Sequence, residues 1–201
     1  MLKNKTITVW FSCGAASAVA AKKTIELYGK HNTIKVVNNP IKEEHEDNQR
    51  FLHDVEKWLE QKIEYAVNPK FPDASCETVW QERKFMSGVF GAPCTLHLKR
   101  NARQVYEIQN PTDYIVLGFT AEEAKRAKRF SETNEQVLLT PLIDEGITKQ
   151  GCFDILLMQG IKLPHIYSLG FPNANCVGCV KAGSPTYWNL VRKTFPDQFL
   201  K

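Results

Sequence analysis

The sequence TITVWFSCGAASA, residues 6–18, joins an apolar, β-branched run to a cluster of small residues. Its first half, Thr6–Phe11, is rich in Thr, Ile, Val and aromatic residues and predicts a β-strand. Residues 12–17 form a short turn of small side chains, and residues 18–28 predict a helix that ends at Gly29. A strand, a tight turn and a helix in this order are typical of a parallel sheet covered by helices.

Strands and helices continue to alternate along the chain. Residues 33–37 and 63–67 predict strands, and the helix expected over 44–61 carries apolar residues on one face. Two more strands are expected at 114–118 and 137–140. Other helices are expected over 76–86, 95–109, 120–132 and 149–159, and after Ser184-Pro185. The alternation predicts the α/β class, with an open, mostly parallel twisted sheet, helices on both faces, and a small irregular cysteine-bearing segment near the C-terminus.

Composition and charge restrict the class of protein. The chain has 201 residues, 43% of them hydrophobic and 24% charged, and a net charge of +4. No apolar run reaches the roughly 18 residues of a membrane-spanning helix, so we expect no membrane segment. The mild positive charge is compatible with an anionic substrate but does not by itself predict nucleic-acid binding. Six cysteines in a chain long enough to build a full core indicate thiol or metal chemistry in a reducing compartment, and we expect a cytoplasmic protein.

The turn at residues 12–17 is a candidate phosphate-binding loop. Its small side chains let backbone N–H groups close on an anion, and the following helix adds the partial positive charge of its N-terminus. The hydroxyls of Ser12 and Ser17 can donate to phosphate oxygens. The pattern is neither that of a mononucleotide P-loop nor that of a dinucleotide fingerprint. From the pattern alone, a phosphate loop and a plain strand-to-helix turn both stay open.

The sequence S-C-G-A-A-S of this turn resembles the pyrophosphate-binding loop (PP-loop) of the ATP pyrophosphatase and phosphoadenosine phosphosulfate (PAPS) reductase superfamily. The family form is S-G-G-x-D-S. Here Cys13 replaces the first glycine, and Ala15-Ala16 replace the last variable residues. The loop therefore lacks the family's acidic residue, and the Mg-linked role of that residue has no carrier at this position.

Further segments match the superfamily in the same order along the chain. Residues 39–51, which include Asp47, resemble the stretch after the second strand, and Cys94-Thr95-x-x-Leu98-Lys99 resembles a C-T-x-x-L-K segment. Residues 118–123, GFTAEE, resemble G-x-R-x-x-E-S with a threonine in place of the arginine. The resemblance implies an adenine nucleotide alpha-hydrolase-like fold. We expect one domain over residues 1–201, with a nucleotide-binding core at 1–145 and C-terminal helices and a Cys-x-x-Cys loop at 146–201.

The resemblance also implies a ligand, ATP or another adenine nucleotide such as adenylyl sulfate (APS) or PAPS. It would bind beyond the carboxyl ends of the strands, where strand order reverses in such sheets. The residues predicted to hold it are Ser12, Gly14, Ala15, Ser17, Asp47, Gly118 and Glu123, and Mg²⁺ stays open as a further cofactor. Three residues are predicted to be catalytic: Cys13, Lys99 and Arg126. The two basic side chains could clamp phosphate or sulfate oxygens, and the Cys13 thiol beside a helix N-terminus is either reactive or a small filler.

Three cysteines form a second candidate site. Cys94 and the pair Cys176-x-x-Cys179 are soft ligands, and a Cys-x-x-Cys pair is equally a redox, zinc or cluster element. Three thiolates suit an iron–sulfur cluster, and the resemblance implies a 4Fe–4S cluster of this kind. Zinc is the alternative, with His97 as fourth ligand, and three buried thiols without metal are a third. Cys76 and Cys152 lie in predicted helices and are expected to be small core residues.

Two reactions fit these features. In the first, ATP adenylates a carbonyl oxygen of an acceptor, pyrophosphate leaves, and sulfur displaces AMP. In the second, a thiolate attacks the sulfate sulfur of APS or PAPS in a reductase that forms sulfite. The first is preferred because no cysteine follows Cys179 to act as that thiolate. A non-catalytic nucleotide-binding partner subunit with a structural zinc is a second alternative. The sulfur donor and acceptor are not specified, a nucleic-acid acceptor and a homodimer stay open, and no membrane partner is expected.

Overall fold

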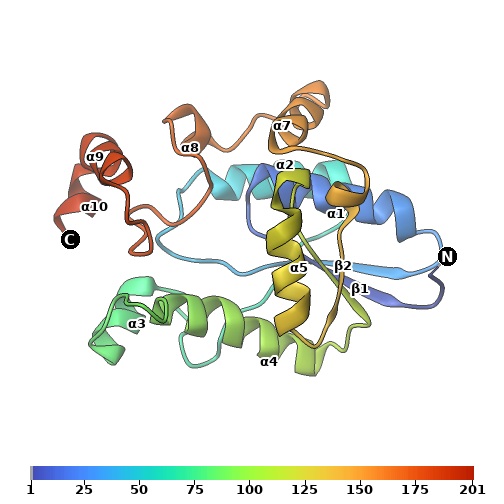
Figure 1. The fold of residues 1–201 in the computed structure, drawn as a ribbon, viewed down its shortest axis with the longest axis horizontal. Helices are drawn as coiled ribbons and strands as arrows, with labels where there is room; N and C mark the ends of the chain where they lie inside the picture. The colour runs from blue at the N-terminus through green and yellow to red at the C-terminus, as the bar shows by residue number, and fades with distance from the viewer. Residues whose placement is uncertain (1) are drawn as a thin grey trace. The chain divides into compact units, whose positions relative to one another are not determined.

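The computed structural model describes residues 2–201 (Figure 1). The chain divides into two compact units, which are described separately. Unit 1 contains residues 2–38, 49–65 and 110–164, and unit 2 contains residues 39–48, 66–109 and 165–201. Both units contain residues from 1–145 and from 146–201. The expected division of the chain into these two parts stays a prediction.

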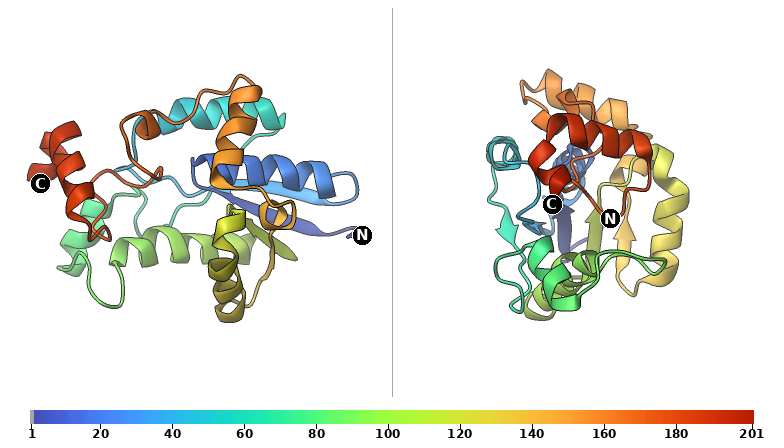
Figure 2. Two further views of the ribbon diagram at one scale, coloured as in Figure 1. Left: turned by 45° about the horizontal axis from the view of Figure 1, so that its top comes forward. Right: turned by 90° about the vertical axis from the view of Figure 1, so that its left-hand side faces the viewer.

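Unit 1 is built on a five-stranded sheet in which every pair of neighbours is parallel, in the order β3-β2-β1-β4-β5. The strands are β1 Thr6–Phe11, β2 Thr33–Asn38, β3 Glu64–Tyr65, β4 Tyr114–Leu117 and β5 Val137–Leu139. All five were predicted within one to two residues at each end. The predicted fold class is confirmed, since an open, parallel sheet carries helices across its connections (Figure 2).

The central strand explains why the sheet forms here. Five of the six β1 residues are buried, as expected of a central parallel strand covered on both faces. Thr8 is fully buried, and its hydroxyl donates to the Thr112 hydroxyl at 3.0 Å. Because β2 pairs with one side of β1 and β4 with the other, strand order reverses between β1 and β4.

The helices of the sheet connections are α1 Ala15–Tyr28, α2 Asn48–Leu59, α5 Ala124–Thr133, α6 Pro141–Asp144 and α7 Lys149–Met158, with a 3₁₀ turn η2 at Ala121–Glu123. Connections between parallel strands are right-handed crossovers. The connections through α1 and α2 run from β1 towards β3, and the connection through α5 runs in the opposite direction, from β4 to β5. The crossovers therefore place α1 and α2 on one face of the sheet and α5 on the other. α1 packs against β1 and β4 on its inner side and against α6 and α7 elsewhere.

Two predicted helix starts differ from the structure. α1 begins at Ala15, three residues early, because Gly14 takes the extended N-cap conformation and the alanines after it join the helix. α2 begins at Asn48 rather than at residue 44, because residues 41–48 form two successive turns with hydrogen bonds from Glu44 to Ile41 and from Asn48 to His45.

Unit 2 is helical. Its elements are α3 Cys76–Arg83, the π-helical η1 Thr95–Asn101, α4 Ala102–Gln109, α8 His165–Ser168, α9 Pro185–Thr194 and α10 Pro196–Leu200. The helix predicted over 95–109 is thus present but begins as a π-helix, and α9 begins after Ser184 as predicted. One small core holds the buried side chains of Ile41, Phe71, Cys76, Val79 and Leu98. In the described part of the chain, no helix is long and apolar enough to cross a membrane.

Candidate functional site

The connection between β1 and α1 has only three residues, Ser12 to Gly14. Gly14 is the N-cap of α1 with φ −102° and ψ 155°, and no side chain of the described residues caps the helix there. The N-terminal N–H groups of an α-helix and its dipole attract anions. The loop lies at the carboxyl end of β1, beside the reversal of strand order, which is where open parallel sheets bind ligands. Ala15, the first residue of α1, is buried.

Ser17 closes this loop with its hydroxyl. The oxygen accepts hydrogen bonds from the Ser12 backbone N–H at 3.1 Å and from the Ser12 hydroxyl at 3.3 Å, and the Ser17 hydroxyl donates to the Gly14 carbonyl at 2.8 Å. Ser17 is buried and Ser12 is exposed. The structure therefore brings together Ser12, Gly14 and Ser17, three residues that were predicted to bind phosphate. Ser17 holds the loop closed, and the Ser12 hydroxyl lies at the surface.

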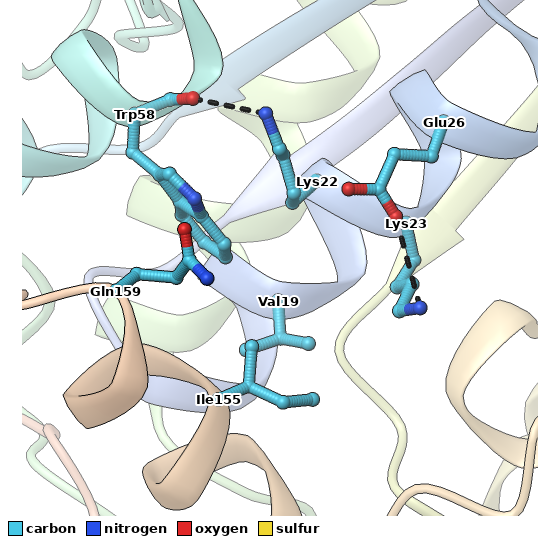
Figure 3. A pocket seen from close by; sticks show the side chains of 7 residues that line it. All are labelled: Val19, Lys22, Lys23, Glu26, Trp58, Ile155 and Gln159. Atoms are coloured by element: carbon cyan, nitrogen blue, oxygen red, sulfur yellow. Dashed lines mark hydrogen bonds and ion pairs between the residues drawn. The ribbon is translucent and has the colours of Figure 1, made fainter.

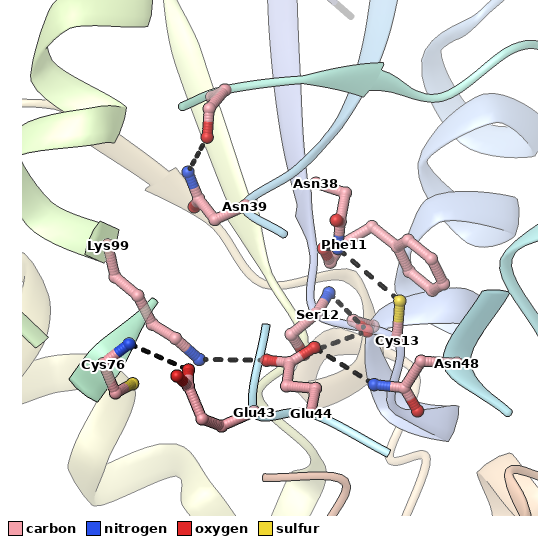
Figure 4. A network of polar contacts seen from close by, with 12 residues as sticks. Phe11, Ser12, Cys13, Asn38, Asn39, Glu43, Glu44, Asn48, Cys76 and Lys99 are labelled. Carbon is pink, nitrogen blue, oxygen red and sulfur yellow. Dashed lines mark hydrogen bonds and ion pairs between the residues drawn. The ribbon is translucent and has the colours of Figure 1, made fainter. Parts of the chain in front are cut away.

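Cys13 has a left-handed backbone, with φ +53°. A residue with a Cβ pays about 1–2 kcal/mol for this conformation, which glycine adopts freely. The left-handed conformation accounts for the glycine that the S-G-G-x-D-S pattern has at the position of Cys13. The Cys13 side chain is 3% exposed, and its sulfur accepts a hydrogen bond at 3.5 Å from the Asn38 amide, which also donates to the Phe11 carbonyl at 2.8 Å (Figure 4). These are the contacts of a buried thiol, and its predicted catalytic role stays a prediction.

Gly118 lies directly against the phosphate loop. It follows β4, and a Cβ at this position would lie 2.7 Å from the Ser17 nitrogen, 2.8 Å from the Ser17 Cα and 3.0 Å from the Ala16 carbonyl carbon. All three are backbone atoms of the first turn of α1, so they cannot move aside as a side chain would. Glycine is therefore required for β4 and α1 to approach this closely.

Glu123 and Arg126 lie at the start of the helical segment after β4. Residues 120–123 form a capping box, in which the Thr120 side chain and the Glu123 carboxylate each accept a hydrogen bond from the other residue's backbone N–H. Glu123 also forms an ion pair with Arg126, whose guanidinium lies 5.2 Å from the Phe119 ring centroid. The Arg126 side chain is 72% exposed and therefore available to an anionic ligand.

Unit 2 contains Cys94, Cys176 and Cys179, the three cysteines predicted to be metal ligands. Cys94 and Cys176 pack against the small core that contains Cys76. Neighbouring thiols among Cys76, Cys94 and Cys176 contribute to the pKa shifts of Cys76, Cys94 and Cys179. We call these four residues the cysteine cluster. Cys94 and Cys176 are 82 residues apart in the sequence (176 − 94), so the fold and not the sequence motif unites them. The role of Cys94, Cys176 and Cys179 as metal ligands stays a prediction, and Cys76, expected to be a small core residue, is buried in the core beside them.

The loop that carries Cys176 and Cys179 is fixed by two residues. Tyr187 accepts a hydrogen bond from the Cys179 N–H at 2.9 Å and donates to the Cys176 carbonyl at 3.2 Å. The Val177 N–H donates to the Glu43 carbonyl at 2.9 Å. Gly178 has φ +70°, which a residue with a Cβ rarely adopts, and so permits the tight turn between the two thiols.

The thiols of the cluster differ in acidity. The hydrogen bond from Cys76 is the largest effect on Cys94 and lowers its pKa to about 6, with a further contribution from the Trp80 indole. Hydrogen bonding with the thiols of Cys176 and Cys94, together with burial, raises the pKa of Cys76. Burial also raises the pKa of Cys179. Cys94 is therefore the most acidic of these three, and the thiolate is the form that binds metals and attacks electrophiles.

One carboxylate, that of Glu44, holds a cation beside the cysteine cluster. Glu44, whose side chain is 7% exposed, lies between the Lys99 ammonium at 3.5 Å and the Asn48 amide at 3.0 Å (Figure 4). Burial raises the pKa of Glu44. Burial alone would lower the pKa of Lys99, but Glu44 and the thiols of Cys176 and Cys76 raise it above its ordinary value. The predicted catalytic Lys99 is thus a cation beside the cysteine cluster.

Asp47, predicted to bind the nucleotide, belongs to unit 2. Its carboxylate accepts a hydrogen bond of 2.7 Å from the backbone N–H of His165, the first residue of α8. The contact places this carboxylate at a helix start, and its predicted ligand role stays a prediction.

His97, the fourth ligand in the zinc alternative, is directed elsewhere. Its ring lies 5.2 Å from the Phe71 ring, and its Nδ1 lies 3.4 Å from the Asn101 amide. Cys76 belongs to the small core against which Cys94 and Cys176 pack. Among residues 2–201, no group of three or more His, Cys, Asp or Glu side chains is arranged to hold a metal ion. Thiolates are nevertheless the ligands that structural zinc sites and iron–sulfur clusters use, so the residue type of the cysteine cluster suits either group.

A hollow of unit 1 lies apart from the phosphate loop. It is lined by Val19, Lys22, Lys23, Glu26, Trp58, Ile155 and Gln159 (Figure 3). Lys22 crosses it and donates to the Trp58 carbonyl at 3.1 Å. The α1 residues of the hollow begin one turn beyond the loop, so it adds nothing to the candidate nucleotide site.

Comparisons with known proteins identify the fold. No protein-family model matches the chain, and no curated protein matches it in sequence. Solved structures do match, and they show that the chain shares its fold with a U34-tRNA thiolase and a PAPS reductase, in agreement with the fold that the sequence resemblance predicted.

Two of these structures come from enzymes of sulfur chemistry. One is a U34-tRNA thiolase, NcsA from Methanococcus maripaludis, with its 4Fe–4S cluster; it is 12% identical, has a TM-score of 0.61, and the match covers 99% of this chain and 70% of that one. The other is a PAPS reductase from Candida auris in complex with phosphate, 8% identical with a TM-score of 0.61 over 85% of this chain and 80% of that one. At these identities the likeness concerns the fold.

Proposed function

We propose that the protein is an enzyme of sulfur metabolism that binds ATP, adenylates an acceptor and transfers sulfur to it, with an iron–sulfur cluster on its cysteines. The observation that carries the proposal is the convergence of Cys94 with Cys176 and Cys179, on a fold shared with a thiolase that holds a 4Fe–4S cluster. That thiolase acts on U34 of tRNA, and we propose a nucleic acid as the acceptor here too.

The nucleotide would bind at the carboxyl ends of β1 and β4. Its phosphates would accept from the first turn of α1, which no described side chain caps, and from the surface hydroxyl of Ser12. Ser17 would preserve the loop shape, and Gly118 the close approach of β4. We retain Gly14, Ala15, Asp47 and Glu123 as nucleotide-binding residues and Arg126 as an exposed cation for phosphate.

In the reaction, the acceptor carbonyl oxygen attacks the α-phosphorus of ATP, and the bond to pyrophosphate breaks. Sulfur then displaces AMP from the activated carbon. The helix N-terminus would bind the pyrophosphate charge as it develops, which is an electrostatic contribution that needs no proton transfer. The loop has no carboxylate for Mg²⁺, so a Mg²⁺ ion would reach the site bound to the nucleotide.

The cysteine cluster fits an iron–sulfur cluster by its donor set. Cys94, Cys176 and Cys179 would hold it, and when bound it would supply soft iron sites for sulfur. Lys99 would offset the negative charge of the thiolates, since its ammonium already interacts with Cys176 and Cys76. Glu44 would keep that ammonium in place through the ion pair at 3.5 Å.

Product analysis separates this function from the alternatives. Release of pyrophosphate from ATP that requires an acceptor RNA supports sulfur transfer. Release of sulfite from APS or PAPS with thioredoxin would instead establish the reductase. Tight nucleotide binding without either product, together with one bound zinc, would establish the non-catalytic partner subunit.

A matched pair of glycine variants tests the nucleotide loop. Gly14→Asp places a carboxylate at the uncapped start of α1 and should abolish nucleotide binding. Gly183→Ala adds a methyl group in open space and should leave binding unchanged. Equal nucleotide affinity in the two variants would remove the loop from the proposed function.

A further inference from the structure

We infer that residues 84–92 of unit 2 bind a single-stranded nucleic acid, with a base stacked on Phe90 and phosphates on Arg83 and Lys84. This segment, which we call the aromatic loop, joins α3 to η1 (Figure 2). The inference rests on the proposed function, which names a nucleic acid as the acceptor but no surface that holds it.

The tip of the aromatic loop is a closed turn. Gly88 and Gly91 exchange two backbone hydrogen bonds, at 3.0 Å from the Gly88 N–H and at 2.9 Å from the Gly91 N–H. These bonds close a two-residue hairpin turn with Val89 and Phe90 as its central residues. A Cβ on Gly88 would lie 2.8 Å from the Phe85 ring, so this ring packs against the base of the turn. Because the turn is already ordered, a ligand that binds it pays little for fixing its conformation.

The side chains at the tip face solvent. Val89 and Phe90 have 98% and 106% of their reference areas exposed, and Phe85 and Met86 are half exposed. The central positions of such turns favour Gly, Asn and Asp. Neither the turn nor the core therefore requires a valine and a phenylalanine here. An exposed apolar patch with a polar rim marks an interaction surface.

The charges beside the aromatic loop are positive. Arg83 and Lys84 directly precede its first ring, and both are exposed. The carboxylate next to them, Glu82, is shared between the Lys70 ammonium at 3.0 Å and the Arg83 guanidinium at 3.9 Å. Lys84 has no carboxylate partner among residues 2–201. Residues 83–106 contain no Asp or Glu, and their cations are Arg83, Lys84, Lys99, Arg100 and Arg103.

A single-stranded nucleic acid fits this combination of rings and cations. Its phosphates pair with Lys and Arg, and its unpaired bases stack on aromatic side chains. An anionic membrane would also attract the cations, but it must bury apolar surface as well. Even one myristoyl chain gives only marginal membrane binding, and the side chains of Val89 and Phe90 together contain fewer carbon atoms than that chain.

The aromatic loop also leads directly to the cysteine cluster. Cys94 follows Gly91 by three positions, so their Cα atoms lie within about 11 Å of each other. A nucleotide stacked on Phe90 would bring the neighbouring nucleotides of the strand towards the thiols to which the proposed function assigns sulfur. The surface would therefore position the acceptor, whereas a membrane on the same loop would bring no acceptor to these thiols.

The test measures the binding of a fluorescein-labelled single-stranded RNA of mixed sequence, about 16 nucleotides long, by fluorescence anisotropy at several salt concentrations. Phe90→Ala is compared with Ile108→Ala, because Ile108 is also apolar and 81% exposed but lies on α4. Lys84→Gln is compared with Lys193→Gln, which removes an exposed cation from α9. All four side chains are exposed, so we expect every variant to fold.

We expect Phe90→Ala to bind the RNA about 5- to 150-fold more weakly, the loss of one base–aromatic stack, with an unchanged dependence on salt. Lys84→Gln should bind more weakly and lower the slope of log affinity against log salt by about 0.7, which is one phosphate contact on a single strand. Phe90→Trp should keep the wild-type affinity because it keeps a stacking ring. The Ile108 and Lys193 variants should match the wild type.

Equal affinity of the wild type and Phe90→Ala would overturn the inference and leave a nucleic-acid acceptor at another surface. A wild type that binds no RNA would overturn the proposed acceptor together with the inference. Sedimentation with vesicles of phosphatidylserine and phosphatidylcholine that is lost in Phe90→Ala, without RNA binding, would assign the loop to a membrane instead. A wild-type dimer that Phe90→Ala dissociates, at unchanged RNA affinity, would assign it to a second copy of the chain and overturn the inference as well.

Discussion

Substitution of Gly118 by alanine gives a direct test of how the sheet and the phosphate loop fit together. The added Cβ would lie 2.7 Å from the Ser17 nitrogen and 3.0 Å from the Ala16 carbonyl carbon, well inside ordinary contact. Overpacking of this kind lowers the free energy of unfolding by about 1–3 kcal/mol. Alanine also reduces the entropy of the unfolded chain, which raises the free energy of unfolding by about 0.4–1 kcal/mol. We therefore expect a net loss of about 1–2 kcal/mol of stability, and weaker nucleotide binding because α1 must shift.

The assay is urea unfolding followed by circular dichroism, together with calorimetric titration of the nucleotide. The matched control is Gly151→Ala, which makes the same chemical change in α7, where the added Cβ meets its neighbours at 3.4 Å. This control should be neutral or stabilised by up to about 1 kcal/mol, because alanine is a better helix former than glycine. If Gly118→Ala were as stable as Gly151→Ala and bound nucleotide normally, the close packing of β4 on α1 would be refuted.

Three further predictions concern single side chains. Cys13→Val puts a β-branched residue at φ +53° and should cost at least about 2 kcal/mol in urea unfolding, whereas a change below 0.5 kcal/mol would contradict the left-handed backbone. Ser75→Ala removes the N-cap of α3 and its hydrogen bond to Glu43, and should lower stability by about 1 kcal/mol, measured as a lower urea midpoint. The hydrogen bond from Lys5 is the main reason that the pKa of Asp113 is lowered, so this carboxylate stabilises the fold above its unfolded pKa, and the contribution is lost as pH falls through the folded pKa. The stability difference between the wild type and Asp113→Asn should therefore be constant near neutrality and shrink below about pH 4, and a difference independent of pH would count against the ion pair.

The sheet could be predicted because its signals are local. The central strands β1, β2 and β4 carry short apolar runs with buried residues, and the placement of the helices follows from the handedness of crossovers. The helix starts at Ala15 and Asn48 were less predictable, since both depend on how the preceding turn satisfies its backbone hydrogen bonds. The short helices α6, α8 and α10 span four or five residues each, too few for a periodic pattern.

The candidate site was predictable where a motif carries it. The phosphate loop and the Cys176-x-x-Cys179 pair are each contiguous in sequence, so each can be recognised as a candidate without the fold. Cys76 was predicted as a small core residue and is buried, although the mostly polar helix α3 that it begins has only Cys76 and Val79 buried. Glu44 was absorbed into the predicted helix over 44–61, which concealed its pairing with Lys99.

The measurement that tests the account most directly is metal, sulfide and absorption analysis of the anaerobically purified protein, beside its Cys176→Ser variant. The account predicts a brown wild-type protein with iron and acid-labile sulfide, and loss of colour and iron in the variant. A colourless wild-type protein with one zinc, or with no metal, would contradict sulfur transfer at the cysteine cluster.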